Sequence, residues 1–300
     1  MVDNESVCAP NKSEFDISCY NINTLKKIVE LYNNQNTKKI DIIGSETKQE
    51  IYDKIIDRLS CEGDVCVLNK LGENPEFKDI IDVMEKNLKP KKPNSWIEEP
   101  NKWTSTSNID DVMNQYDLAY PEFTFLGTVP IDFDDKLIGA DICVSEDLCK
   151  IDLNKLWNNG TRMIGVVFNL DPHYKSGSHW VSLFINLRNC GIYYFDSTGT
   201  FPPKRVLDLI ERIKKQGDTL LQNNKKFKMY SKEKIHDIKG NHEFRAFFND
   251  TQHQKKNTEC GVYSIFFLTE MIKGKSFIDF VDNVYDDDYI AKLRDVFWRS

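Results

Sequence analysis

Cys260 stands at the start of a long apolar segment and is the residue best placed in this chain to act as a nucleophile. Residues 262–272 carry mostly apolar side chains and contain neither proline nor glycine, which predicts a buried helix. In the first turn of a helix, unpaired backbone N–H groups and the positive end of the dipole favour a thiolate over a thiol. A lone cysteine in such a place is more often an inert core residue. The nucleophile hypothesis therefore depends on partner residues elsewhere.

Gln254 lies six residues before Cys260, in a polar loop that shows no apolar periodicity. A loop of this length can fold back and bring its amide beside the sulfur. An amide donor in that position, together with the backbone N–H of Cys260, would form an oxyanion hole for acyl transfer.

A histidine and an aspartate stand at the ends of two predicted strands. Runs of β-branched and aromatic residues predict strands at 163–170, 179–187 and 190–197. His179 opens the second strand and Asp196 closes the third, so antiparallel pairing would bring them together. The carboxylate would then fix the tautomer of the imidazole and stabilise the imidazolium. With Cys260 and Gln254, these residues make up the set of groups that a thiol protease needs.

Other residues compete for two of these roles. His173, which precedes a polar loop resembling an active-site flap, and His253, next to the loop glutamine, are alternative bases. Asn186 or Asn189 could replace Asp196 as the group that orients the base. We prefer Asp196 because of its spacing and its place at the end of a strand.

Taken in chain order, these residues resemble the SUMO-protease and adenovirus-protease superfamily of cysteine peptidases. The motif reads His179-Trp180, Asp196-Ser197, Gln254 and Glu259-Cys260-Gly261, whereas papain-type enzymes have the order Cys, His, Asn. The segment NTECGVYS is similar to the branch found in large DNA viruses. Upstream similarity to that branch involves Trp103, Asn108 and residues 125–133, and the resemblance covers about residues 102 to 275.

The resemblance implies an α+β fold with a central, mainly antiparallel sheet. The nucleophile would lie at the N-terminus of a buried helix, and a small helical arm domain would precede the catalytic domain. The resemblance also implies that Trp180 walls a narrow channel that admits only small residues, and that Trp103 and Asn108 bind substrate.

The implied function is a cysteine endopeptidase that processes viral structural polyproteins, after small glycine-containing motifs, during virion maturation. We expect it in the virion and in the host cell cytoplasm, a reducing compartment, and we expect no cofactor and no metal. Its partners would be a capsid or core polyprotein and, through the N-terminal domain, other virion proteins. The alternatives are a protease that removes SUMO-like or ubiquitin-like modifiers, and an inactive module that binds a glycine-ended tail.

Composition and net charge argue against several other classes of protein. The chain has 300 residues, 40% of them hydrophobic, which suffices for a globular core. Its net charge of −7 argues against a general nucleic-acid binder, and we interpret the lysines between 225 and 234 as a solvated loop. We expect no membrane span or signal peptide, because the longest apolar runs are short and the first residues are polar.

We interpret the other cysteines and a run of three aspartates as structural residues rather than as a metal site. Eight cysteines are too few for a disulfide scaffold and show no zinc-finger spacing, so we expect reduced thiols. Cys61 and Cys66 could bind a metal or pair with each other, but we interpret them as ordinary loop and core residues. The triplet at 286–288 is interpreted as a solvated turn or a helix start rather than a metal site.

The chain divides by pattern into three parts. Residues 1–88 predict a helical arm domain, residues 89–101 a proline-rich linker, and residues 102–300 the catalytic domain. Within the last part, further elements are an edge strand around 123–133, a helix that Gly217 ends, strands at 226–230 and 243–249, and a closing helix at 289–298.

Overall fold

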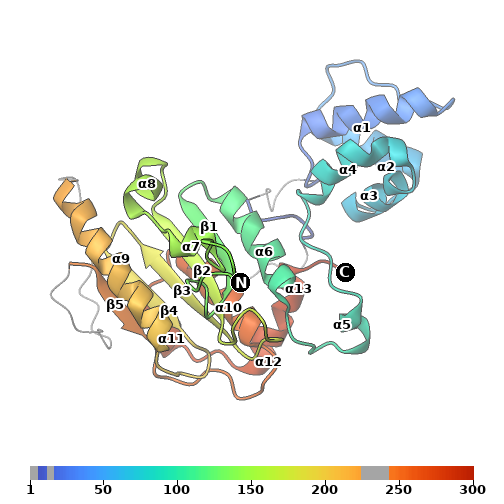
Figure 1. Cartoon of the computed structure of the whole chain (residues 1–300). Helices are drawn as coiled ribbons and strands as arrows, with labels where there is room; N and C mark the ends of the chain where they lie inside the picture. Colours follow the sequence, from blue (N-terminus) through green and yellow to red (C-terminus); the bar gives the residue numbers. More distant parts are fainter. Residues whose placement is uncertain (1–5, 12–16, 224–242) are drawn as a thin grey trace. The chain divides into compact units, whose positions relative to one another are not determined.

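The computed structural model describes residues 6–11, 17–223 and 243–300 (Figure 1). Two compact units make up the chain: Met1–Lys92 with Asp295–Ser300, and Pro93–Arg294. The lysines between 225 and 234 and the strand predicted at 226–230 lie outside the described residues. In the described parts, no helix is both long and apolar enough to cross a membrane.

The first unit is helical. Its elements are α1 (Ile22–Gln35), α2 (Lys48–Leu59), α3 (Asp64–Gly72), the 3₁₀ turn η1 (Pro75–Phe77) and α4 (Lys78–Glu85). Helix α2 begins with a capping box, in which Thr47 and Glu50 each bond the other's backbone N–H. Apolar side chains from these helices, such as Leu25, Ile51 and Met84, form one buried core.

The last residues of the chain lie with this first unit, although we assigned them to the catalytic domain. The backbone N–H of Arg299 donates to Pro90 and that of Lys92 donates to Arg299. These bonds pair the C-terminus with the segment that follows α4. An ion pair between Lys92 and Asp295 adds to these bonds. Apolar patterning could not reveal this pairing, because backbone groups and charged side chains make it.

The second unit contains a five-stranded sheet in the order β1-β2-β3-β4-β5. The strands are β1 (Phe123–Pro130), β2 (Met163–Asn169), β3 (Trp180–Asn186), β4 (Gly191–Phe195) and β5 (Arg245–Phe248). The three central strands pair antiparallel, whereas β1 and β5 pair parallel to their neighbours. The predicted α+β class is therefore confirmed, but the sheet is mixed rather than mainly antiparallel.

Two long helices pack against the two faces of this sheet. Each face carries its own apolar side chains, because successive strand residues point to opposite sides. Helix α9 (Lys204–Asn223) packs its apolar stripe with Val181, Leu183 and Ile185 of β3. Helix α10 (Cys260–Ile272) lies against the other face, where Phe267 stacks on Phe195. Almost every residue of α10 is buried, which confirms the predicted buried helix.

The second unit contains seven further helices among the described residues. They are α5 (Ser95–Glu98), α6 (Thr106–Ala119), α7 (Glu146–Cys149), α8 (Leu153–Asn158), α11 (Phe277–Asp282), α12 (Asp287–Lys292) and α13 (Arg294–Phe297), the last of which begins in this unit. Helix α6 packs against the edge strand β1.

Helix α9 does not end at Gly217, and that prediction is wrong. The helix continues to Asn223. A β-carbon on Gly217 would lie 2.3 Å from the ring of Phe244, so the glycine provides space for close packing rather than a helix stop.

Six of the eight cysteines form disulfides, so the expectation of reduced thiols is wrong for these six. The pairs are Cys8–Cys19, Cys61–Cys66 and Cys143–Cys149. Cys190 and Cys260 are free and buried. Pairing of Cys61 with Cys66 was an alternative that we did not prefer, and the other two pairs were not predicted, because their partners are neighbours only once the loops between them are folded.

Candidate active site

His179 and Asp196 meet at one end of the β3–β4 pair. His179 directly precedes β3 and Asp196 directly follows β4, and the antiparallel register places Ser182 opposite Phe195. Nε2 of His179 lies 2.8 Å from Oδ1 of Asp196. The predicted meeting of the two side chains is thus confirmed.

The carboxylate of Asp196 is held rigidly. The residue is 1% exposed, and Oδ1 also accepts hydrogen bonds from the N–H and the hydroxyl of Thr198, both at 2.8 Å. The side chain of Asn249 accepts from the backbone N–H of Asp196 at 2.9 Å and donates to its carbonyl at 2.7 Å. These contacts leave Asp196 little freedom, so it can fix the orientation of the His179 ring.

Cys260 is the first residue of α10, as predicted, and lies beside His179. Burial by itself lowers the pKa of His179, but hydrogen bonds to Asp196 and to Cys260, with the charges of both partners, raise that pKa to about 10. The imidazolium form is therefore favoured at neutral pH. An imidazolium next to a sulfur at a helix N-terminus is an environment that stabilises a thiolate.

The loop before α10 fixes the amide of Gln254. The backbone N–H groups of His253 and Gln254 both donate to the carbonyl of Ser197, at 2.9 and 2.8 Å. The hydroxyl of Ser197 donates to Oε1 of Gln254 at 2.6 Å. Because the amide oxygen is bound by Ser197, the NH₂ group is the part of this side chain that can donate to an oxyanion.

Asp287 holds the next part of the same loop, which the sequence did not indicate. Its Oδ2 accepts the backbone N–H groups of Lys255 and Lys256 at 2.9 and 3.0 Å, and the residue is 6% exposed. Asp286 caps α12 by accepting from the N–H of Tyr289, so the predicted helix start is confirmed. Asp287 is buried, however, and the interpretation of the whole triplet as solvated is wrong.

A buried ion pair fixes the residue before Cys260. Nε of Arg294 donates to Oε2 of Glu259 at 2.9 Å, and both side chains are buried. The guanidinium lies 4.2 Å from the ring centre of Trp96. Removing one partner would leave the other as an unpaired buried charge, so this pair holds the start of α10 firmly.

Trp180 and Gly261 enclose the site from the side of α6. The indole N–H of Trp180 donates to the carbonyl of Thr104 at 3.0 Å. A β-carbon on Gly261 would lie 1.9 Å from Oγ1 of Thr104 and 3.1 Å from the Trp180 ring. Glycine next to Cys260 therefore permits a close approach that any other residue would prevent.

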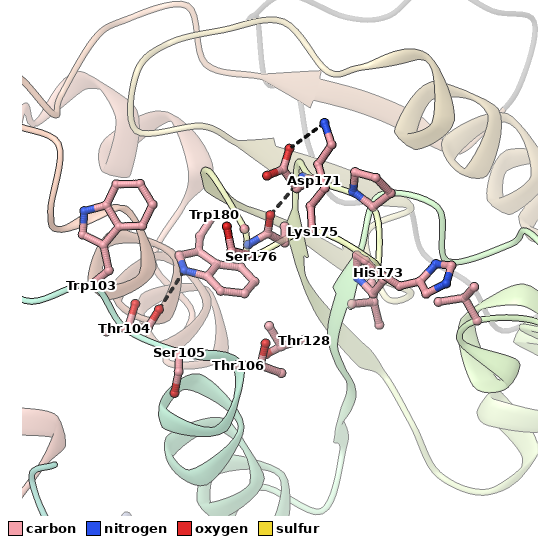
Figure 2. A pocket seen from close by; sticks show the side chains of 16 residues that line it. Trp103, Thr104, Ser105, Thr106, Thr128, Asp171, His173, Lys175, Ser176 and Trp180 are labelled. Atoms are coloured by element: carbon pink, nitrogen blue, oxygen red, sulfur yellow. Dashed lines mark hydrogen bonds and ion pairs between the residues drawn. The ribbon is translucent and has the colours of Figure 1, made fainter.

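A pocket of about 580 Å³ adjoins Trp180. Its walls come from the start of α6, the end of β1 and the loop between β2 and β3 (Figure 2). Trp103 and Trp180 line it, whereas Asn108 does not. The side chain of Asn108 instead forms a capping box with Ser105 at the start of α6, which gives this residue a structural role.

The alternative bases have other partners. Nδ1 of His173 lies 2.7 Å from Asp132. His253 is buried among the rings of Phe195, Phe280 and Tyr285, and burial lowers its pKa. His179 is the histidine that bonds Cys260.

The alternative orienting residues lie at the turn between β3 and β4. The side chain of Asn186 accepts from the backbone N–H of Arg188. Asn189 accepts from the N–H of Gly191 and donates to the hydroxyl of Tyr193. Both asparagines thus stabilise the turn.

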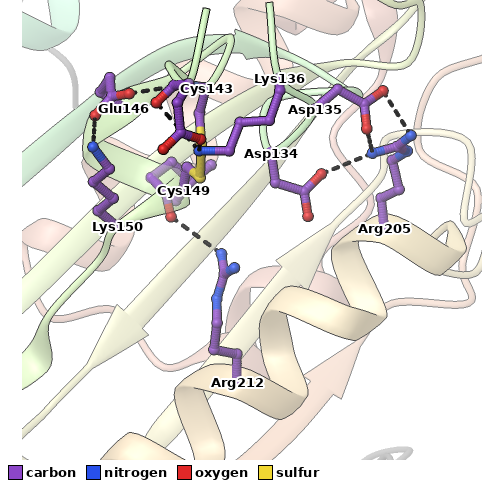
Figure 3. The surroundings of a disulfide bond; sticks show 11 residues. Asp134, Asp135, Lys136, Cys143, Glu146, Cys149, Lys150, Arg205 and Arg212 are labelled. Carbon is purple, nitrogen blue, oxygen red and sulfur yellow. Dashed lines mark hydrogen bonds and ion pairs between the residues drawn. A yellow bond between two sulfur atoms is a disulfide. The ribbon is translucent and has the colours of Figure 1, made fainter.

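A disulfide and two ion pairs hold the loop between β1 and α7, which contributes one residue to the pocket. The disulfide Cys143–Cys149 joins its end to α7, and Arg205 binds Asp134 and Asp135 at 2.8 Å (Figure 3). Val144, in the same loop, lines the pocket.

A single cluster with spacing suited to a metal ion occurs among the described residues, and it lies in the first unit. It comprises Cys8, Cys19 and Asp64. The two sulfurs are joined in a disulfide, and the carboxylate accepts from the Ser18 hydroxyl and the Cys19 N–H. These three residues therefore do not fit a metal ion as they stand.

Comparison with known proteins agrees with this geometry. The model for the Ulp1 protease family, C-terminal catalytic domain, matches residues 147–295. A putative thiol protease of Acanthamoeba polyphaga mimivirus is 29% identical over 315 residues, which cover 98% of this chain and 94% of the relative. A protein of African swine fever virus, named cysteine protease or SUMO-1 cysteine protease depending on the isolate, is 26% identical over 80% of this chain and 84% of its own length.

The fold is also found in a solved structure. The crystal structure of the African swine fever virus protease superimposes with a TM-score of 0.64 at 20% sequence identity, covering 100% of this chain and 97% of the other. The similarity therefore includes the helical first unit as well as the sheet.

Proposed function

We propose that Cys260, His179, Asp196 and Gln254 are the catalytic residues of a cysteine peptidase. The premise is that residues 147–295 match the model of the Ulp1 protease family and that the similar proteins include viral thiol proteases. Cys260 is the nucleophile and His179 the base. Asp196 orients the imidazole, and Gln254 stabilises the oxyanion. The observation that supports this most directly is the 2.8 Å contact between Nε2 of His179 and Oδ1 of Asp196, with Cys260 interacting with the same ring.

The reaction follows from this arrangement. The thiolate of Cys260, paired with the His179 imidazolium, attacks the carbonyl carbon of the scissile peptide bond. The charge that forms on the carbonyl oxygen is stabilised by the Cys260 backbone N–H and the Gln254 amide. His179 then donates its proton to the leaving amine, and the C–N bond breaks to give an acyl-enzyme. Water, deprotonated by His179, hydrolyses the thioester and releases the second product.

The substrate that we propose is a viral structural polyprotein, cut after a small glycine-containing motif. The close contacts among Trp180, Thr104 and Gly261 support a narrow approach to the sulfur, which suits residues without side chains. We place this activity in the virion and the host cytoplasm, with the first unit available to bind other virion proteins.

Incubation of the purified full chain with two substrates tests the proposal. The first is a Gly-Gly-X peptide library drawn from capsid-type polyproteins, and the second is a SUMO C-terminal fusion. The variant Cys260→Ala serves as the control in both. Cleavage of short peptides that the variant does not cleave supports the endopeptidase. Failure of the native chain to cleave either substrate would count against it.

Removal of a ubiquitin-like modifier is the second candidate function. Its support is that some of the African swine fever virus relatives carry the name SUMO-1 cysteine protease. Cleavage of the fusion without cleavage of short peptides would favour this alternative, because such an enzyme depends on the folded surface of the modifier as well as on the glycine tail.

A further inference from the structure

His173 lines the pocket at the end opposite Trp103 (Figure 2), and it forms a second histidine–aspartate pair with Asp132. The carboxylate of Asp132 accepts the backbone N–H of His173 at 2.9 Å and lies 2.7 Å from its Nδ1. An ionised carboxylate can only accept, so Nδ1 carries a proton. This leaves Nε2 as the atom through which His173 can bind a ligand. The His173 side chain is 44% exposed, so a ligand can reach it.

The loop that carries His173 is held in shape without a ligand. Oδ1 of Asn169, at the end of β2, accepts the N–H groups of Asp171 and Ser178 at 2.9 and 3.2 Å. Gly177 has φ +96°, and a β-carbon there would lie 2.6 Å from Nδ2 of Asn169. The loop therefore packs directly on Asn169, and His173 is positioned in advance of binding.

The charges around the pocket balance. Lys175 lies 4.0 Å from Asp171, and Asp132 compensates any charge on His173. The other polar side chains of the lining are uncharged, and they include hydroxyls, as in Ser105 and Ser176, and the amide of Asn169. A pocket without net charge disfavours a charged ligand, which would lose its hydration without gaining an opposite charge. Its volume of about 580 Å³ is within the usual range of ligand pockets.

We propose that this pocket binds an uncharged hydrogen-bonding side chain of the substrate, that of asparagine, glutamine, serine or threonine, close to the cleavage site, and that Nε2 of His173 recognises it. The inference rests on the proposed function, since it assigns a substrate residue to the pocket beside Trp180. It makes His173 a residue that determines specificity. One hydrogen bond of this kind corresponds to up to about a tenfold preference over alanine at that substrate position.

Two substitutions of His173 separate the roles of its ring nitrogens. The amide of His173→Asn can still donate to Asp132 from the position of Nδ1, but it has no group at the position of Nε2. The amide of His173→Gln reaches the position of Nε2 instead. Tyr174→Phe, on the neighbouring exposed residue outside the pocket lining, is the matched control for disturbance of the loop.

The experiment measures kcat/KM of the full chain on glycine-containing peptides randomised at the positions flanking the cleavage site. The native chain and Tyr174→Phe should prefer the four uncharged polar residues at one position by about tenfold, His173→Asn should lose the preference, and His173→Gln should keep most of it. Equal preference in the native chain and His173→Asn would overturn the proposal. The rate of Cys260 alkylation by iodoacetamide, unchanged in all variants, verifies that the catalytic centre is intact.

A binding measurement separates this inference from the proposed function. The same peptides are titrated against Cys260→Ala, with and without His173→Asn, and Kd is measured by fluorescence anisotropy. If the native chain cleaves no peptide but binding shows the preference and His173→Asn removes it, the pocket assignment stands and the proposed protease activity fails. If peptides are cleaved but neither cleavage nor binding depends on the polar residue, the pocket assignment fails alone.

Discussion

Gly261 lies so close to Thr104 that a β-carbon on the glycine would come within 1.9 Å of the Thr104 hydroxyl oxygen. We therefore expect Gly261→Ala to displace either the start of α10 or the segment before α6. Overpacking of this kind costs about 1–3 kcal/mol. Chemical denaturation should show the loss of stability, and peptide cleavage should show a larger loss of activity, because the displaced residue adjoins Cys260.

Thr104→Ala provides the matched test of that cause. It removes the hydroxyl but leaves a β-carbon 3.1 Å from the position of the added methyl group. The double variant should therefore regain part, but not all, of the stability that Gly261→Ala loses. Gly261→Ala with native stability and native activity would show that the close approach has no consequence.

Asp287 should affect turnover through the loop that carries Gln254. Deleting the donor in Gln254→Ala should lower kcat by about 10²–10³, the usual effect of removing one oxyanion-hole donor. Asp287→Asn keeps the shape of the side chain but weakens its bonds to the N–H groups of Lys255 and Lys256. We expect kcat to fall by about tenfold, with the rate of Cys260 alkylation by iodoacetamide unchanged.

The neighbouring aspartate is the control for charge. Asp288 pairs with Lys256 at the surface, and both side chains are mostly exposed. Asp288→Asn removes the same charge without touching the backbone of the loop, so it should leave kcat near the native value. A similar loss in both variants would attribute the effect to net charge rather than to the loop.

His179 should titrate well above an ordinary histidine. Its bonds to Asp196 and Cys260 raise its pKa to about 10, so the imidazolium persists at neutral pH. Cys260→Ala removes one of these partners and should lower the pKa, and Asp196→Asn should lower it as well. NMR of the imidazole ¹⁵N resonances measures the three values directly. An unchanged pKa in Cys260→Ala would mean that the sulfur does not interact with the ring.

The raised pKa of His179 also determines how the free energy of unfolding changes with pH. The folded chain binds a proton at His179 that the unfolded chain, with a histidine pKa near 6.5, releases. The contribution of His179 is therefore complete below about pH 6.5 and is lost as pH rises toward 10.

Local patterns in the sequence were sufficient to predict that His179 and Asp196 meet, but not to predict the residues that hold the surrounding loops. The runs of β-branched and aromatic residues in β3 and β4 predict two strands, and antiparallel pairing of these strands brings His179 and Asp196 together. The parallel pairing of β1 and β5 depends on long connections that no local pattern describes. Asp287 binds backbone N–H groups 31 and 32 residues away, and such bonds depend on no side-chain type at the donor.

His253 should make the chain sensitive to acid. It is 1% exposed and lies among aromatic rings, and burial lowers its pKa. The unfolded chain therefore binds a proton more readily than the folded chain as pH falls below about 6.5, and the free energy of unfolding decreases by up to ~1.4 kcal/mol per pH unit. His253→Phe, which keeps an aromatic ring, should reduce this slope in urea titrations between pH 7 and 5. An unchanged slope would assign the acid sensitivity to other groups.

The cysteines should separate into two classes when the protein is purified without reductant. The chain has eight cysteines, of which Cys190 and Cys260 are free. Alkylation of the denatured, unreduced chain should therefore modify two residues, and alkylation after reduction should modify all eight. Intact-mass spectrometry counts the modified residues.

Reduction of the disulfides should also lower Tm, because a disulfide typically stabilises a folded protein by about 2–4 kcal/mol by restricting the unfolded chain. The loops closed here are short, with partners 5, 6 and 11 residues apart, which places the expected effect per bond at the lower end of that range. Eight modified residues without reduction would show that the thiols are free in solution, as their spacing in the sequence alone suggests.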